Sequence, residues 1–156
     1  MVGIPGSGKS TWAEQFVAQQ VLASRQYQQI STDDVRAQLY GDAAVQGEWR
    51  KIWAEVMRQL RICYALIEQG QLAGAIYDAT NARRRDRREA LSAFRTLGFG
   101  PIEAVWLDTP LAVCLLRNRG RSRQVPIDVI ERMHRQLTDA PPTRSEDFDV
   151  IQRIQP

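Results

Sequence analysis

A glycine-rich stretch near the start of the chain, Gly3–Thr11, has the spacing G-x-x-x-x-G-K-[ST]. Its glycines lack a Cβ and accept positive φ angles, so the backbone can fold into a small concavity. The N–H groups of such a loop, and the positive end of the helix that follows it, bind phosphate oxygens. In this pattern the lysine reaches the β- and γ-phosphates and the next hydroxyl ligates Mg²⁺. The stretch therefore predicts a site for ATP and Mg²⁺.

The residues expected to bind ATP in this loop are Gly3, Pro5, Gly6, Ser7, Gly8, Lys9, Ser10 and Thr11. Lys9 is also a catalytic candidate, and Ser10 is a candidate Mg²⁺ ligand. A buried strand of about five residues normally precedes such a loop, but only Met1 and Val2 do so here. We therefore expect the native start to lie upstream of Met1.

Length and composition predict one cytoplasmic domain without membrane contact. The chain has 156 residues, of which 44% are apolar and 25% charged, as in ordinary globular proteins. It contains no apolar run of about 18 residues and no visible signal peptide. Cys63 and Cys114 lie in apolar helical patterns, which favours buried, reduced thiols. The oligomeric state is not predicted.

Strands alternate with helices along the chain, which predicts a three-layer α/β fold with a parallel sheet flanked by helices. After the short first strand, further strands are expected at 27–31, 74–77, 102–107 and 149–154. Helices are expected at 9–20, 32–40, 48–69, 84–97, 111–117 and 126–137, and a loop at 139–146. In the longest helix a buried stripe is predicted from Trp49, Trp53, Val56, Leu60, Cys63 and Ile67.

Polar residues follow the strands, where open parallel sheets bind their ligands. Asp33 and Asp34 either cap a helix, with Ser31 or Thr32 as N-cap, or supply a general base for phosphoryl transfer. Asp78 either holds Mg²⁺ or forms an Asx turn.

Thr80 and Asn81, which come next, either contact the substrate or order the turn. His134, the one histidine, is interpreted as structural because no catalytic partners accompany it.

Arginine accounts for 19 of the 21 basic residues, and many arginines fall in two clusters. Arg117, Arg119, Arg121 and Arg123 lie on a loop that either closes over a nucleotide as a lid or is simply solvated. The second cluster, 83–88, either lines a nucleic-acid groove or forms the solvent-exposed face of a helix.

Several motifs in order resemble the kinase domain of phage polynucleotide kinase and its bacterial P-loop relatives. They are Gly6–Ala13, Asp33–Arg36, Asp78–Asn81 followed by Arg87 and Arg88, and Arg117–Gly120 leading to Val125–Val129. The resemblance spans nearly the whole chain. It implies a P-loop fold of the adenylate-kinase type and transfer of the γ-phosphoryl group of ATP to the 5′-hydroxyl of DNA or RNA.

The resemblance also implies individual roles. Asp33 matches the general base and Arg36 a residue that contacts the 3′-phosphate of the acceptor. Thr80 matches a residue near the acceptor, and Arg117 and Arg119 match lid arginines that stabilise the migrating phosphoryl group. A single kinase domain over 1–156 with a lid around 117–126 is thus expected. A small-molecule or toxin-type kinase and a non-catalytic ATP-binding module are the alternatives.

Overall fold

The computed structural model describes residues 1–155. The chain forms two compact units, one of residues 1–9 together with the chain from Thr80 onward, the other Ser10–Ala79. The expectation that both belong to one kinase domain stays a prediction.

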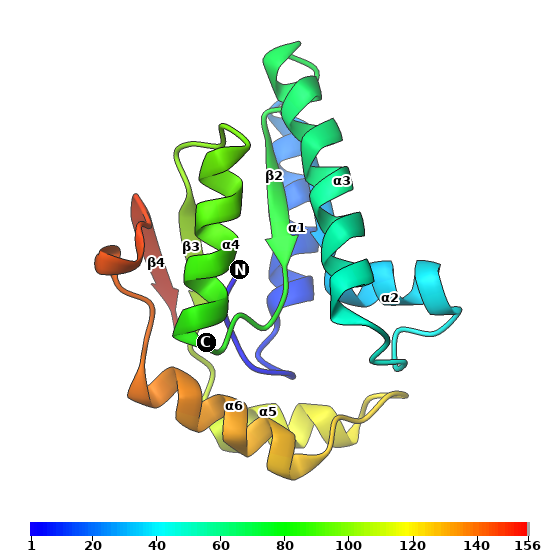
Figure 1. Ribbon diagram of the computed structural model, residues 1–156. Coiled ribbons are helices and arrows are strands. Elements are labelled where there is room, and N and C mark those ends of the chain that lie inside the picture. The colour runs from blue at the N-terminus through cyan, green and yellow to red at the C-terminus, as the bar shows by residue number, and fades with distance from the viewer. Residues whose placement is uncertain (156) are drawn as a thin grey trace. The chain divides into compact units, whose positions relative to one another are not determined.

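The unit Ser10–Ala79 is built on two parallel strands, β1 (Tyr27–Ser31) and β2 (Gly74–Asp78). The register pairs Tyr27 with Gly74 and Ser31 with Asp78, so both strands end at the same edge. Three helices complete this part of the chain: α1 (Lys9–Leu22), α2 (Thr32–Tyr40) and α3 (Trp49–Glu68). The longest of them, α3, runs alongside β2 (Figure 1).

The core of this unit matches only part of the predicted stripe, because Trp53 and Ile67 are half-buried rather than buried. Ile52, Val56, Leu60 and Cys63 of α3 are buried. Trp49, expected in the core, is 53% exposed, and its ring stacks on Trp53 with the centroids 6.0 Å apart. The apolar period was therefore identified correctly, but the buried face begins at Ile52.

The other unit is also built on parallel strands. β3 (Glu103–Leu107) pairs with β4 (Val150–Ile154), and Val2 forms a parallel bridge with Trp106 on β3. Val2 N–H donates to Val105 O at 2.8 Å, so the chain enters the phosphate loop from an extended segment, as expected. The helical elements of this unit are α4 (Arg84–Thr96), α5 (Leu111–Arg119), α6 (Ile127–Asp139) and the 3₁₀ turn η1 (Arg144–Glu146).

Helices α5 and α6 lie side by side in Figure 1. Their buried residues join the start of the chain in one core, whose members are Val2, Ile4, Ala82, Cys114, Ile130 and Leu137. Packing against this core thus fixes the residues just before and within the phosphate loop.

The α/β class and the parallel strands agree with the sequence. The strands pair two by two, β1 with β2 and β3 with β4, so a single three-layer sheet stays a prediction. The loop expected at 139–146 is wrong in one respect, because it contains η1. Across the described residues, none of the helices has both the length and the apolar composition that a bilayer crossing requires.

Candidate functional site

The phosphate loop is folded around its lysine. Lys9 is the first residue of α1, and its Nζ donates to the carbonyl oxygens of Gly3 at 2.9 Å and Ile4 at 3.2 Å. Ser7 N–H donates to Ile4 O at 3.1 Å, which closes the turn. The ammonium group is thereby held against the carbonyl oxygens of its own loop, and its contact with the phosphates stays a prediction.

Helix α5 supports the loop from one side. A Cβ added at Gly6 would lie 2.5 Å from the carbonyl oxygen of Cys114, so a side chain at this position has no room. Thr109 Oγ1 donates to Ser7 O at 2.8 Å. Arg117 Nη1 donates to Gly6 O at 3.3 Å and approaches Ser7 O at 3.5 Å. The structure thus brings Arg117 to the phosphate loop.

The residues of the phosphate loop differ in how far they are exposed. Pro5 is buried, and Ser7 is 1% exposed. Ser7 Oγ has no hydrogen-bond partner within the described residues. Gly6, Gly8 and Lys9 are partly exposed, and Ser10 and Thr11 are exposed. Their part in nucleotide binding stays a prediction.

A serine and an aspartate with the chemistry of a Mg²⁺ site meet within Ser10–Ala79. Ser10 Oγ donates to Asp78 Oδ2 at 3.1 Å, and Gln29 Nε2 donates to the same oxygen at 3.2 Å. Asp78, at the end of β2, is 6% exposed.

The described residues contain no cluster of three or more histidine, cysteine or acidic ligands. Mg²⁺ in nucleotide sites takes one or two protein oxygens and completes its shell with phosphates and water. The Ser10 and Asp78 oxygens therefore fit this ion.

The capping interpretation of the acidic pair after β1 is confirmed, and the general-base interpretation stays a prediction. Ser31 is the N-cap of α2, and its Oγ accepts the N–H groups of Asp33 and Asp34 at 3.2 and 3.3 Å. The carboxylate of Asp33 accepts a hydrogen bond from Arg36 Nη1 at 2.7 Å, with 53% of the Asp33 side chain exposed. Capping by Ser31 thus leaves the Asp33 carboxylate at the surface. There it is paired with Arg36, the residue predicted to contact the 3′-phosphate of the acceptor substrate.

Thr80 and Asn81 attach the segment after β2 to the start of the chain. Gly3 N–H donates to Thr80 O at 3.0 Å. Asn81 has a positive φ of 48°, and its side-chain amide donates to Met1 O at 2.7 Å. The amide of Asn81 therefore orders the turn, and substrate contact by either residue stays a prediction.

Asn118, which the sequence reasoning missed, joins the two ends of the loop that is predicted to be a lid. Its side chain is 3% exposed and makes two hydrogen bonds to Val125, through Nδ2 to the carbonyl and Oδ1 to the N–H, both at 2.9 Å. The arginine-rich loop is thus tied into a closed turn. Arg119 is exposed at the end of α5, and motion of the lid stays a prediction.

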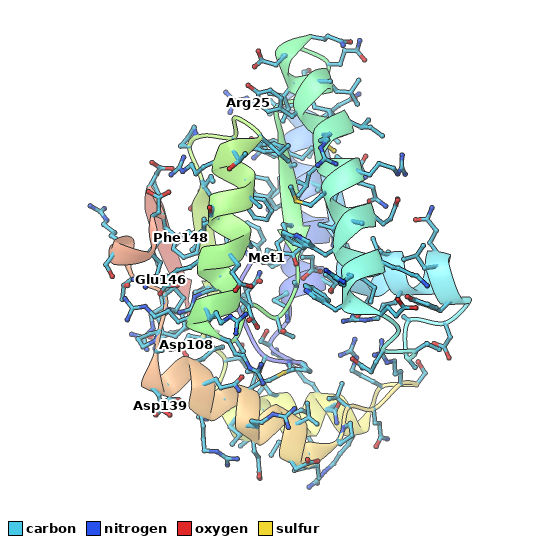
Figure 2. The ribbon with its side chains drawn as sticks, viewed as in Figure 1. Met1, Arg25, Asp108, Asp139, Glu146 and Phe148 are labelled. Atoms are coloured by element: carbon cyan, nitrogen blue, oxygen red, sulfur yellow. The ribbon has the colours of Figure 1, made fainter. Side chains whose placement is uncertain are left out.

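The arginines of 83–88 do not act as one surface. Arg87 is 2% exposed and forms an ion pair with Glu146, at 2.7 Å from Nε to Oε2. Figure 2 shows Glu146 at the side of α4. Arg87 is therefore removed from any nucleic-acid groove, which corrects both open interpretations at this position.

Glu146 was missed because its segment was predicted to be a loop. One signal was available: Thr143-Arg144-Ser145-Glu146 has the capping-box pattern [ST]-x-x-E. The structure forms this capping box, with Thr143 N–H donating to Glu146 Oε1 at 3.2 Å.

The two cysteines are free and buried, as predicted. Burial raises the pKa of both thiols above the ordinary value, so neither is a thiolate nucleophile near neutral pH. His134 lines a cavity of about 360 Å³ together with Trp106 and Arg153, and its structural role stays a prediction.

A phosphate loop folded around its lysine, and a serine after it that is paired with a strand-end aspartate, define a P-loop nucleotide-binding protein. The family model described as AAA domain (AAA_33) matches residues 1–140, which is most of the chain. The chain belongs to this family, whose members are P-loop NTPase-like kinases.

Proposed function

We propose that the protein is an ATP- and Mg²⁺-dependent phosphotransferase whose acceptor is the 5′-hydroxyl of DNA or RNA. The observation that carries the proposal is the exposed carboxylate of Asp33, held by Arg36 at 2.7 Å at the start of α2. An exposed carboxylate can accept a hydroxyl proton, and an arginine beside it can bind a phosphate of the same acceptor.

The proposed reaction needs little covalent chemistry from the protein. The acceptor oxygen forms a bond to the γ-phosphorus, its proton passes to Asp33, and the bond to the β–γ bridging oxygen breaks to release ADP. Lys9 and the lid arginines Arg117 and Arg119 stabilise the charge on the transferred group.

Two further groups are assigned within this proposal. Ser10 and Asp78 would hold Mg²⁺, which when bound neutralises phosphate charge. Arg36 and Thr80 would position the acceptor. A single kinase domain, a lid at 117–126 and a cytoplasmic location complete the proposal.

The test is transfer of labelled γ-phosphate from ATP to a 5′-hydroxyl oligonucleotide by the wild type, Asp33→Asn and Asp34→Asn. The two aspartates are a matched pair, because both are exposed and both donate their N–H to Ser31 Oγ. General-base catalysis contributes about 10²–10⁴-fold. Asp33→Asn should lose transfer on that scale with ATP affinity retained, whereas Asp34→Asn should stay near the wild type.

Four results would contradict parts of this proposal. Loss of ATP binding in Asp33→Asn would give Asp33 a structural role. Absence of label on the oligonucleotide with the wild type would refute the polynucleotide assignment, and small hydroxylated acceptors would be tested next. An oligonucleotide affinity that does not fall with salt would also favour a small-molecule kinase. Failure with every acceptor would leave a non-catalytic ATP-binding module.

A further inference from the structure

A small cavity lies between the start of α4 and the face of α6, entirely within one unit. Its volume is about 140 Å³, and its lining includes Thr80, Arg83, Asp86, Arg132, Met133 and Gln136. Thr80 connects it to the phosphate loop, because the carbonyl oxygen of Thr80 accepts the N–H of Gly3 at 3.0 Å.

Arg83 differs from the arginines that follow it. Arg84 donates to Ser145 Oγ at 2.9 Å, Arg85 pairs with Glu89 at 2.8 Å, and Arg87 pairs with Glu146. The guanidinium groups of these three neighbouring arginines therefore bind other residues of the protein.

Within residues 1–155, the side chains of Arg83 and Arg132 have no hydrogen-bond or ion-pair partner, and both line the cavity. Among the described residues that line it, Asp86 is the only acidic one, so the cavity carries a net positive charge. Two arginines without internal partners at one cavity point to an anionic ligand.

The size of the cavity limits the ligand. Sites for whole small molecules have volumes of roughly 300–1,000 Å³, whereas this cavity measures about 140 Å³. It is therefore suited to one small group and not to a complete nucleoside. Guanidinium groups bind phosphate with two parallel hydrogen bonds, and hydroxyl and amide side chains such as those of Thr80 and Gln136 commonly bind the other oxygens.

We propose that this cavity binds an internal phosphodiester of the acceptor strand, downstream of the nucleotide that bears the 5′-hydroxyl. The inference rests on the proposed function and deepens it, because it assigns Arg83 and Arg132 to recognition of a polynucleotide rather than of a mononucleotide. An acceptor with only one phosphate would then gain nothing from the cavity, whereas a longer strand would.

The experiment compares the wild type with Arg83→Gln, Arg132→Gln and the double variant. Affinity is measured by fluorescence anisotropy with a single-stranded hexanucleotide labelled at its 3′ end, from low to high salt. Each phosphate contact to a single strand contributes about −0.7 to the slope of log K against log[salt]. Each single variant should bind the hexanucleotide several-fold more weakly and flatten this slope by about 0.7, and the double variant should do so by about twice that.

Two controls separate the cavity from the rest of the protein. Arg85→Gln removes an exposed arginine of the same helix that does not line the cavity, and it should keep the wild-type slope. ATP affinity and transfer to a nucleoside 3′-monophosphate should be unchanged in every variant, because neither ligand carries an internal phosphodiester.

The outcomes distinguish this inference from the proposed function. An unchanged slope in the double variant, an equal loss in Arg85→Gln, or a parallel loss of ATP affinity would overturn the inference, even if the wild type transfers phosphate. An arginine-dependent slope without transfer to any 5′-hydroxyl would support the cavity and refute the proposed reaction.

Discussion

Arg87 and Glu146, which are 59 residues apart in the chain, form a bidentate ion pair whose side chains are 1% and 0% exposed. The second hydrogen bond of the pair joins Nη2 to Oε1 at 2.8 Å. The remaining guanidinium hydrogens reach the carbonyl oxygens of Asn81, Ala82 and Ala140 at 2.8 to 3.2 Å. One buried side chain thereby fixes the segment after β2, the end of α6 and the η1 turn.

Removing one partner of this pair should strongly destabilise the protein. A buried charge that loses its partner costs about 3–5 kcal/mol, so Arg87→Ala and Glu146→Ala should each lower the free energy of unfolding by that amount. Arg85→Ala is the control, because Arg85 belongs to an exposed pair with Glu89, and exposed pairs contribute little to stability. Urea unfolding followed by circular dichroism measures both, and losses of equal size would refute the structural role of Arg87.

The ion pair between Arg87 and Glu146 could not be predicted from the sequence. Adjacent arginines in 83–88 look alike in the sequence, and only the position of Glu146 makes Arg87 a core residue. That partner comes from long-range packing, although the capping-box pattern of Thr143 and Glu146 indicates a helical turn that begins at Arg144 and has Glu146 as its third residue.

Local patterns were sufficient elsewhere. The G-x-x-x-x-G-K-S spacing and the alternation of strands and helices predicted the phosphate loop and most element positions. The same period placed Trp49 in the core, because periodicity identifies a face but not how far along the helix that face is covered. The hydrogen bonds between Asn118 and Val125 were not predictable, since an asparagine near a helix end can form several different local hydrogen bonds with the backbone.

Gly6 should be far less tolerant of alanine than a glycine with the same backbone angle elsewhere. Gly6 and Gly41 have φ of 83° and 78°, but a Cβ at Gly6 meets Cys114 O at 2.5 Å, whereas nothing lies within 4 Å of one at Gly41. Both substitutions force an alanine into the left-handed region, at about 1–2 kcal/mol. Gly6→Ala should cost a further 1–3 kcal/mol through overpacking against α5.

The displaced loop should also bind ATP at least ten-fold more weakly in Gly6→Ala. Isothermal titration calorimetry measures the affinity, and urea unfolding measures the stability of both variants. Gly41→Ala should keep the wild-type affinity for ATP. If Gly6→Ala were no worse than Gly41→Ala in both measurements, the close packing of the phosphate loop on α5 would be refuted.

Asp149 should make stability depend on pH in the acid range. Ile102 N–H and Arg95 Nη2 both donate to Asp149 Oδ2 at 2.6 Å, at the point where β3 and β4 begin. These two hydrogen bonds, that from Ile102 first, hold the pKa of Asp149 below its ordinary value. The folded state therefore binds this proton less readily than the unfolded state does, so the stabilisation is complete above the unfolded pKa of about 3.9.

Asp149→Asn should consequently lower the melting temperature at pH 7, and the gap from the wild type should narrow as the pH falls below about 4. Glu103→Gln is the control, because Glu103 is an exposed acid on β3. Its gap should be small and nearly constant over the same range. Thermal unfolding between pH 2.5 and pH 7 measures both gaps, and a gap for Asp149→Asn that stayed constant or widened toward low pH would mean that the carboxylate does not stabilise the fold in its charged form.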